Sequence, residues 1–312
     1  MISLVDPELR MVRKWAAIAG NWSFDGPHAT YLGPSGGVVP YGLALTDVEL
    51  RDGAVSVMVS FDSDKPAGCT GGIVLGYQSE SSPYITIGLG GHDYAYGITE
   101  YTPALGWRAL IAAGSIANLA GRIEYPLEVT QLGQKLFVSV DGVRIFEHVL
   151  GQPLAGNQVG LYAYGETKVS FTNAQAQRKQ PRAFVAMQFT EPFDTLYRRV
   201  IKPRATKLGF DVVRIDEVAG PGIIFQDIQR EIAESMVVIA EITAPNQNVF
   251  YELGYAHALN KPTILLARRQ KDAQLPFDIR SYRVIFYDDT IGGKVEVEQQ
   301  LQEHLSAIMN DL

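Results

Sequence analysis

Residues 237–266, which read VVIAEITAPNQNVFYELGYAHALNKPTILL, decide the fold of this chain. The stretch opens with an apolar run rich in β-branched residues, 237–242, a pattern typical of a strand buried on both faces. Proline and asparagine residues over 243–248 predict a turn, with Asn246 or Asn248 as the N-cap of a small-residue helix over 249–259. A second apolar strand, 263–267, completes the unit. The two strands are therefore expected to lie parallel and to be joined by a right-handed crossover.

The same alternation of strands and helices extends over the C-terminal part of the chain. Further strands are predicted at 183–188, 211–215 and 283–287, and further helices at 193–208, 223–235 and 295–310. Five parallel strands with flanking helices predict a flavodoxin-like α/β domain with strand order 2-1-3-4-5. In that order the carboxyl ends of the first and third strands adjoin, and open α/β sheets bind ligands at such a switch point.

The N-terminal half has a different pattern, with short alternating runs broken by Gly, Pro, Asn and Asp. Strands are predicted at 54–61, 72–77, 84–89, 127–131, 135–140 and 159–163. Asp141-Gly142 is a favourable hairpin turn between two of them. Evenly spaced strands without helices predict a β-sandwich or a barrel. Residues 7–19 carry apolar side chains at helical spacing, so a short helix is expected there.

A polar segment, 172–180, separates the two patterns. A boundary in such a segment predicts a multidomain α+β chain, with a β-sandwich domain over 1–177 and an α/β domain over 178–312.

The composition is that of an ordinary globular chain. It has 312 residues, of which 46% are hydrophobic and 20% charged, and a net charge of −7. General affinity for nucleic acid or an anionic membrane is therefore not expected. Cys69 is the single cysteine, which argues against disulfides and multi-thiolate zinc sites. Without a membrane-length apolar run or a secretion signal, a cytoplasmic protein with neither metal nor other cofactor is expected.

Glu252 interrupts the apolar pattern of the central predicted helix. It is expected in the first helical turn, just beyond the carboxyl end of the preceding strand, where ligands bind in open α/β sheets. The helix dipole favours an ionised carboxylate there, which suits a nucleophile or hydrogen-bond acceptor better than an acid. The alternative is a structural glutamate that only complements the dipole.

Other polar side chains are expected to line the same cleft. They are Gln188, Asp216, Glu217, Glu241, Asn246, Asn248 and Tyr251. Asp216 and Glu217 have the alternative of being solvated loop acids, and Tyr251 can equally pack against the sheet.

The segment 248–258, NVFYELGYAHA, with Lys261-Pro262 after it, resembles the nucleoside 2-deoxyribosyltransferase-like group, which borders on the TIR-like domains of bacterial immunity proteins. The run 184–189, FVAMQF, looks like the first strand of that group, although Gln188 stands where proline is commoner. The resemblance extends over 181–312.

This resemblance implies that Glu252 attacks C1′ of a ribosyl or deoxyribosyl group, or holds the sugar hydroxyls while the N-glycosidic bond breaks. Asn246 and Asn248 would orient ribose hydroxyls, and Asp216 or Glu241 would assist protonation of the base. Many transferases of the group carry an acidic residue at the position of Asn246, so hydrolysis is favoured over base exchange. A nicotinamide leaving group needs no acid, which favours NAD+ as the substrate.

The N-terminal half resembles a concanavalin A-like jelly roll. The runs that carry this resemblance are LEVTQLGQKLFVSVDGVRIFEH (127–148) and VGLYAYGETKVSFTN (159–173). It implies ligand sensing or self-association. Candidates for stacking on a sugar or another planar ligand are Trp22, Trp107, Tyr94 and Tyr96. Core packing is the alternative for these aromatic residues.

Three functions are open at this point. The first is a regulated N-glycosidase that cleaves the base–ribose bond of NAD+ or a related nucleotide, in antiphage defence as the resemblance implies. The second is a 2-deoxyribosyltransferase in nucleoside salvage, and the third is a non-enzymatic nucleotide- or sugar-binding sensor. The expected partners are a nucleotide or nucleoside substrate, a sugar or another small ligand on the β-sandwich, and further copies of the chain.

Overall fold

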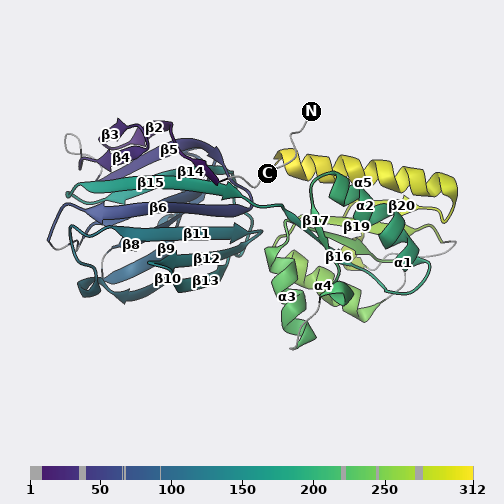
Figure 1. The fold of residues 1–312 in the computed structure, drawn as a ribbon. Coiled ribbons are helices and arrows are strands. Elements are labelled where there is room, and N and C mark those ends of the chain that lie inside the picture. Colours follow the sequence, from purple (N-terminus) through teal and green to yellow (C-terminus); the bar gives the residue numbers. More distant parts are fainter. Residues whose placement is uncertain are drawn as a thin grey trace.

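The computed structural model describes residues 9–34, 40–64, 66, 68–91, 93–218, 223–243, 246–270 and 277–311. These residues form an all-β half and an α/β half that lie side by side (Figure 1). The chain passes from one to the other between Arg178 and Arg182. None of the described helices is long and apolar enough to cross a membrane.

Two antiparallel sheets form the all-β half. One has the strand order β13 (Val143–Val149), β12 (Lys135–Val140), β11 (Tyr125–Leu132), β6 (Gly53–Phe61), β15 (Val169–Arg178), β4 (His28–Tyr31) and β3 (Trp22–Asp25), with β1 (Leu9–Met11) on β15. The other has the order β10 (Gly106–Ser115), β9 (Tyr94–Thr102), β8 (Tyr84–Gly90), β7 (Thr70–Tyr77), β14 (Gln158–Tyr164), β5 (Tyr41–Glu49) and β2 (Trp15–Ala19). A short 3₁₀ turn, Ile116–Asn118, follows β10.

The side chains between the sheets make this half a sandwich. Along β6, Val55, Val57 and Val59 are buried and alternate with half-exposed residues, as a strand with one face on a core requires. The six strands predicted from the sequence are all present. Asp141 and Gly142 have φ of 51° and 73°, so the predicted hairpin turn between β12 and β13 is confirmed.

The helix expected over residues 7–19 is wrong for the part that the structure describes. Leu9–Met11 pair with β15 and Trp15–Ala19 pair with β5, so both segments are strands at sheet edges. Residues 7 and 8 lie outside the described residues. Pairing with an open sheet edge satisfies the backbone and overrides a short helical spacing of apolar residues.

A five-stranded parallel sheet forms the centre of the α/β half. Its order is β17 (Asp211–Val213), β16 (Arg182–Ala186), β18 (Val237–Glu241), β19 (Thr263–Arg268) and β20 (Val284–Tyr287). All four pairings are parallel, which confirms the predicted strand order 2-1-3-4-5.

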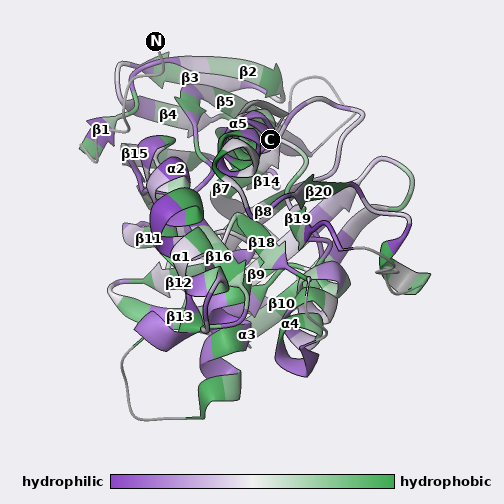
Figure 2. Ribbon diagram, turned by 90° about the vertical axis from the view of Figure 1, so that its right-hand side faces the viewer, coloured by the Kyte–Doolittle hydropathy of each residue, from purple (hydrophilic) through white to green (hydrophobic). Residues whose placement is uncertain are grey.

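Helices cover both faces of this sheet (Figures 1 and 2). The helical elements are α1 (Phe193–Leu196), the π turn Tyr197–Ile201, α2 (Lys202–Lys207), α3 (Ile224–Glu234), α4 (Gln247–Ala258) and α5 (Ile291–Asp311), with 3₁₀ turns at Ile215–Glu217 and Phe277–Ile279. Val185 of β16 faces a cluster formed with α1, α2 and α5, whereas Phe184 faces the cluster formed with α3 and α4. Each strand of the sheet centre is therefore buried on both sides, as its near-continuous apolar sequence predicts.

Pro203 explains why the predicted helix over 193–208 is not uniform. Proline has no N–H, so the regular bond to residue 199 cannot form. The backbone instead widens into a π turn, in which the N–H of Lys202 donates to the carbonyl of Tyr197. The helix continues on both sides of this turn and keeps its apolar face on the sheet.

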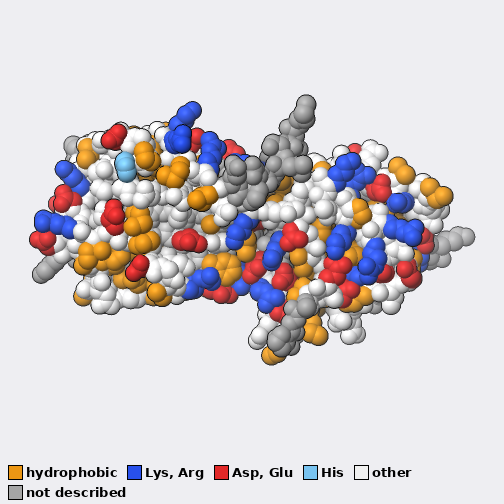
Figure 3. Space-filling view, viewed as in Figure 1, with side chains coloured by type: hydrophobic (Ala, Val, Ile, Leu, Met, Phe, Trp, Pro, Cys, Tyr) orange, Lys and Arg blue, Asp and Glu red, His pale blue; other side chains and the backbone are white. Residues whose placement is uncertain are grey.

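The two halves meet along a polar seam. The C-terminal end of α5 reaches the sandwich, where Arg51 donates to the carbonyl of Ile308 at 3.2 Å. Lys135 of β12 pairs with Glu234 of α3 at 3.2 Å. On the face drawn in Figure 3, charged side chains crowd over the α/β half and the seam and are sparser over the sandwich.

Candidate functional site

α4 is the helix that carries Glu252, and it follows the central strand β18. The side chain of Asn246 caps it by accepting hydrogen bonds from the N–H of Asn248 at 2.9 Å and of Val249 at 3.4 Å. The helix begins two residues before its predicted start, so Glu252 lies in the second turn and not in the first. The helix dipole stabilises a carboxylate less at that depth.

The Glu252 side chain is largely buried. The residue is 5% exposed and shares a helix face with Val249, Leu253 and Ala256, which pack on the sheet. Burial raises the pKa of Glu252 to about 7, and none of the described residues forms a hydrogen bond or ion pair with it. Glu252 is therefore ionised less readily than the helix dipole alone would imply. Near neutral pH the group is close to its midpoint and can bind or release a proton.

Glu241 ends β18 on the opposite face of the sheet. Alternation along the strand puts Ile239 and Glu241 on the face that α5 covers, whereas α4 covers the other face. The Glu241 carboxyl group accepts hydrogen bonds from the N–H and hydroxyl of Thr243 and from the hydroxyl of Tyr287 at 3.1 Å. Burial is the main cause of its raised pKa. Glu241 thus has several donors, unlike Glu252.

Asp216 and Glu217 contact cationic and hydroxyl groups of the α/β half itself. The buried Arg214 donates to both carboxylate oxygens of Asp216, at 2.6 and 2.7 Å, and to Asp194 at 2.9 Å. Glu217 accepts a hydrogen bond from the hydroxyl of Tyr197 at 2.8 Å. These contacts place both acids on the α1 side of the sheet, with Glu241 and away from α4.

Arg214 is the residue of this network that the sequence analysis missed. Its guanidinium group stacks on Tyr197 at 4.0 Å and on Phe189 at 5.2 Å, so a cation is buried at the carboxyl end of the sheet. A single arginine directly after a buried strand, with two acids beyond it, is the signal that could have indicated it.

The remaining predicted contacts lie near α4 or β16. Asn248 and Tyr251 are exposed on α4, and Asn246 is its cap. The Tyr251 ring lies 5.1 Å from that of Phe225 of α3, measured between ring centroids, so the two helices present an aromatic pair. The half-buried Gln188 follows β16 by two residues. Substrate contact by these four residues stays a prediction.

No group of three or more His, Cys, Asp or Glu side chains able to hold a metal ion occurs among the described residues.

The sandwich carries a cleft of about 390 Å³ on the outer face of the β10–β2 sheet. Its floor contains glycines that lie opposite one another on neighbouring strands, since Gly88 of β8 pairs with Gly97 of β9. The wall is aromatic. Trp107 lies 5.0 Å from Tyr162 and 6.5 Å from Tyr41, measured between ring centroids. A flat floor with an aromatic wall leaves room for a planar or ring-shaped ligand.

The four aromatic residues named from the sequence have different positions. Trp107 and Tyr94 line the cleft. Trp22 packs on Tyr31 and Phe171, with centroids at 5.5 and 5.8 Å. Tyr96 packs against the sandwich core. Tyr41, Tyr162 and Tyr164, which line the cleft, were missed, because only the pairing of distant strands brings them together.

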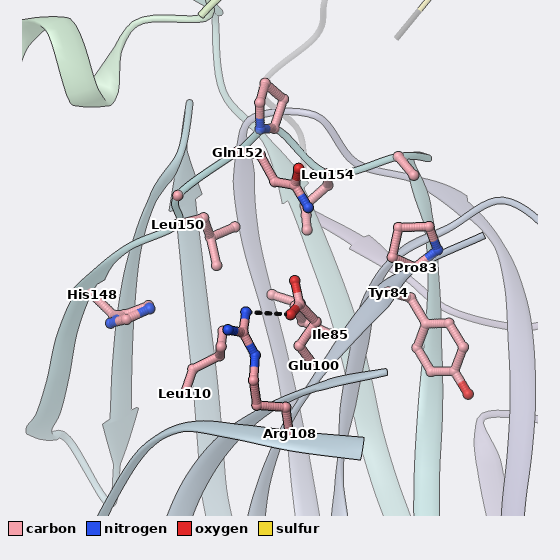
Figure 4. A pocket seen from close by; sticks show the side chains of 13 residues that line it. Pro83, Tyr84, Ile85, Glu100, Arg108, Leu110, His148, Leu150, Gln152 and Leu154 are labelled. Atoms are coloured by element: carbon pink, nitrogen blue, oxygen red, sulfur yellow. Dashed lines mark hydrogen bonds and ion pairs between the residues drawn. The ribbon is translucent and has the colours of Figure 1, made fainter. Parts of the chain in front are cut away.

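A second cavity, of about 270 Å³, opens at the edge of the sandwich (Figure 4). Arg108 of β10 pairs there with Glu100 of β9 at 2.6 Å. His148 of β13 faces the same space, and burial lowers its pKa. The wall nearest the α/β half is the loop that begins at Leu150 and includes Leu154.

No family model and no curated protein matches the chain. Solved structures resemble its N-terminal half. A carbohydrate-binding module, CBM66, from Bacillus subtilis is 10% identical, with a TM-score of 0.45, over 53% of this chain and 96% of its own. A native glycosidic hydrolase is 12% identical, with a TM-score of 0.42, over 57% and 97%.

A β-1,3-1,4-glucanase (lichenase) derived from a mouse hindgut metagenome is 11% identical, with a TM-score of 0.41, over 53% of this chain and 92% of its own. Similarity at this level says nothing about ligand or activity. The resemblance of residues 181–312 to the 2-deoxyribosyltransferase-like and TIR-like proteins stays a prediction.

Proposed function

We propose that the chain is an N-glycosidase that cleaves the base–ribose bond of NAD+ or a related nucleotide, with Glu252 as the catalytic carboxylate. The observation that carries this proposal is the state of Glu252. It is a buried carboxyl group without a partner among the described residues, its pKa is raised to about 7, and it lies on the helix that follows the central strand.

A carboxyl group in this environment is costly for stability. Burying an ionisable group without a donor disfavours its charged form, and a leucine or glutamine would fill the same space without that cost. Strongly perturbed and unpaired carboxyl groups concentrate at functional sites, because a proton or a developing positive charge there can be exploited. Glu241 has its donors in place, so it is better explained as a structural residue.

The proposed reaction needs little beyond one carboxylate. The bond between C1′ and the pyridinium nitrogen breaks, and its electron pair goes to the ring, so nicotinamide leaves as a neutral molecule. The positive charge that develops on the ribose is stabilised by ionised Glu252, either through space or by a transient bond to C1′. Water then adds its oxygen to C1′ and gives up a proton. Nicotinamide needs no general acid, whereas an adenine leaving group does.

The flavodoxin-like strand order supports the placement of the substrate. The carboxyl ends of β16 and β18 adjoin at the point where the connections turn to opposite faces of the sheet. On this proposal Gln188, Asn248 and Tyr251 contact the substrate from the α4 side. Asp216, Glu217 and Glu241 keep their structural partners on the other side.

Product analysis separates hydrolysis from base exchange. The wild-type chain is incubated with NAD+ and, separately, with deoxynucleosides plus a different free base, and the products are read by mass spectrometry. We expect nicotinamide and ADP-ribose from NAD+. New deoxynucleosides without net hydrolysis would identify a 2-deoxyribosyltransferase instead. Tight nucleotide binding that is unchanged in Glu252→Gln, without turnover in either protein, would identify a sensor.

The cleft of the sandwich supports a second function, binding of a sugar ring. Its glycine floor and aromatic wall of Trp107, Tyr41 and Tyr162 offer an apolar face for stacking. The hydroxyl groups of Thr86 and Thr99 at the same face can bond the ring edge.

Titration with a panel of soluble oligosaccharides, followed by tryptophan fluorescence, tests this second function. Binding should change the emission of Trp107 and be lost in Trp107→Ala. Leu105→Ala, at a residue that is 84% exposed and does not line the cleft, serves as the control. An emission change that survives in Trp107→Ala would place the ligand elsewhere.

A further inference from the structure

One turn of the sandwich touches the ends of two helices of the α/β half. This turn joins β11 to β12 and contains Gly133 and Gln134. The backbone N–H of Gln134 donates to the carbonyl of Ala233, in the last turn of α3, at 3.0 Å. Its side-chain amide donates to the carbonyl of Leu259, the C-terminal cap of α4, at 2.7 Å. A single residue of the sandwich therefore donates to carbonyls at the C-terminal ends of α4, which carries Glu252, and of its neighbour α3.

The same side-chain amide also bonds within the sandwich. It donates to the carbonyl of Leu150 at 3.0 Å, and the N–H of Leu150 donates back to the Gln134 carbonyl at 2.9 Å. Leu150 begins the loop that walls the cavity in Figure 4. The two hydrogens of the Gln134 Nε2 amide therefore link the loop at Leu150, which walls that cavity, to the end of α4. These bonds also fix which end of the amide faces the helix.

Gly133 lets the turn approach α3 this closely. A Cβ atom there would lie 2.5 Å from the Ser235 carbonyl oxygen and 2.7 Å from that of Ala233. The backbone is also left-handed, with φ of 54°. The N–H of Gly133 donates to the buried carboxyl group of Asp52 at 2.6 Å, which holds the turn from the sandwich side. Because the turn is packed this closely, it cannot shift without moving the ends of α3 and α4 as well.

We propose that Gln134 is a positioning residue for the reaction proposed above: it ties α4, and with it Glu252, to the loop of the sandwich that begins at Leu150. The role of Gln134 in catalysis rests on the proposed function, whereas its contacts with the two halves do not depend on it. α4 has 12 residues, so it moves largely as one rigid rod between its cap at Asn246 and its end at Leu259. A movement of the Leu259 end therefore alters how deeply Glu252 is buried.

The test compares two glutamines that make the same kind of bond. Gln134→Met keeps the length of the side chain and removes both amide donors. Gln158→Met is the control, since Gln158 donates its amide only within the sandwich, to the Thr46 carbonyl at 3.0 Å. Amide hydrogen exchange at Leu259, Asn260 and Lys261 reports the end of α4. The titration midpoint of the Glu252 carboxyl group is measured from the NMR signal of its carboxyl carbon, which is assigned by its absence in Glu252→Gln. This midpoint reports how deeply the group is buried.

In Gln134→Met we expect roughly tenfold faster exchange at these three amides, because the hydrogen bond that holds the Leu259 end of α4 is lost. The titration midpoint of Glu252 should fall by roughly half a pH unit or more, as water reaches a looser helix. Gln158→Met should leave both readings at their wild-type values. If NAD+ is cleaved, the pH–rate midpoint should shift with the titration.

A folded Gln134→Met chain with unchanged exchange and an unchanged Glu252 midpoint would overturn the inference. Equal changes in Gln158→Met would do the same, because they would indicate general destabilisation. If Gln134→Met does not fold, Gln134→Asn, which keeps the amide but is one methylene too short to reach both carbonyls, gives the same two readings. A wild type that leaves NAD+ intact would refute the proposed reaction and not the coupling, which is measured without substrate.

Discussion

Glu252 lies on the buried face of α4, where desolvation makes its charged form costly. Its pKa of about 7 in the folded chain exceeds the ordinary value of 4.5. The folded state therefore holds this proton more tightly than the unfolded state does. Its contribution to stability is full below pH 4.5 and is lost as the pH rises through about 7.

Glu252→Gln should therefore raise the free energy of unfolding at pH 8, by up to about 3 kcal/mol, and change it little at pH 4.5. Urea unfolding at the two pH values measures this difference. The control is Glu241→Gln, which weakens bonds from Thr243 and Tyr287 and should destabilise at pH 8. An equal effect of Glu252→Gln at both pH values would contradict the assigned burial.

The same pKa predicts the pH dependence of catalysis. If ionised Glu252 stabilises the ribosyl cation, the cleavage rate should rise with pH and reach half its maximum near pH 7. Initial rates between pH 5 and pH 9 give this profile. A rate that falls over the same range would assign Glu252 as a proton donor and refute its role as the catalytic carboxylate.

At the scale of elements, the turn between β11 and β12 joins the sandwich to the C-terminal ends of α3 and α4. Gly133→Ala should cost more than Gly142→Ala, although both glycines have positive φ. Gly142 has nothing within 4 Å of its Cβ position, so alanine there costs about 1–2 kcal/mol of backbone strain. At Gly133 the collision with Ser235 adds roughly 2 kcal/mol or more. Chemical unfolding of both variants checks this order, and equal losses would refute the collision.

The elements themselves were largely predictable from local sequence. The parallel strand order and the Asp141-Gly142 hairpin follow from patterns of a few residues. The predicted cap at Asn246 is confirmed, and the helix begins directly after it, two residues before the start that the apolar spacing indicated. The short helix over 7–19 failed because its residues pair with strands far away in the chain.

The candidate site was only partly predictable. The motif around Glu252 indicated a carboxyl group at the right helix, but its raised pKa depends on burial that no local pattern reveals. The bonds of Asp216 to Arg214 and of Glu241 to Tyr287 required knowing which face each strand residue occupies. Gln134 was not indicated at all, because its partners lie about a hundred residues away along the chain.

For the whole molecule, we expect the contacts along the seam to make the two halves unfold together. The groups that bond across the seam to the ends of α3 and α4 are buried. The side chains of Lys135 and Glu234 are each 9% exposed, and Gln134 is 2% exposed. Scanning calorimetry of the wild type should therefore give one unfolding transition. Gly133→Ala should separate it into two, whereas Gly142→Ala should keep one. Two separate transitions in the wild type would show that the halves are only loosely joined.

The central claim is that Glu252 breaks a base–ribose bond. The most direct measurement is the rate of nicotinamide release from NAD+ by the wild type, by Glu252→Gln and by the matched control Glu241→Gln, each shown to be folded. We predict release by the wild type, at least a hundredfold less by Glu252→Gln, on the order of a lost catalytic carboxylate, and substantial release by Glu241→Gln. Equal rates for the wild type and Glu252→Gln would contradict the account.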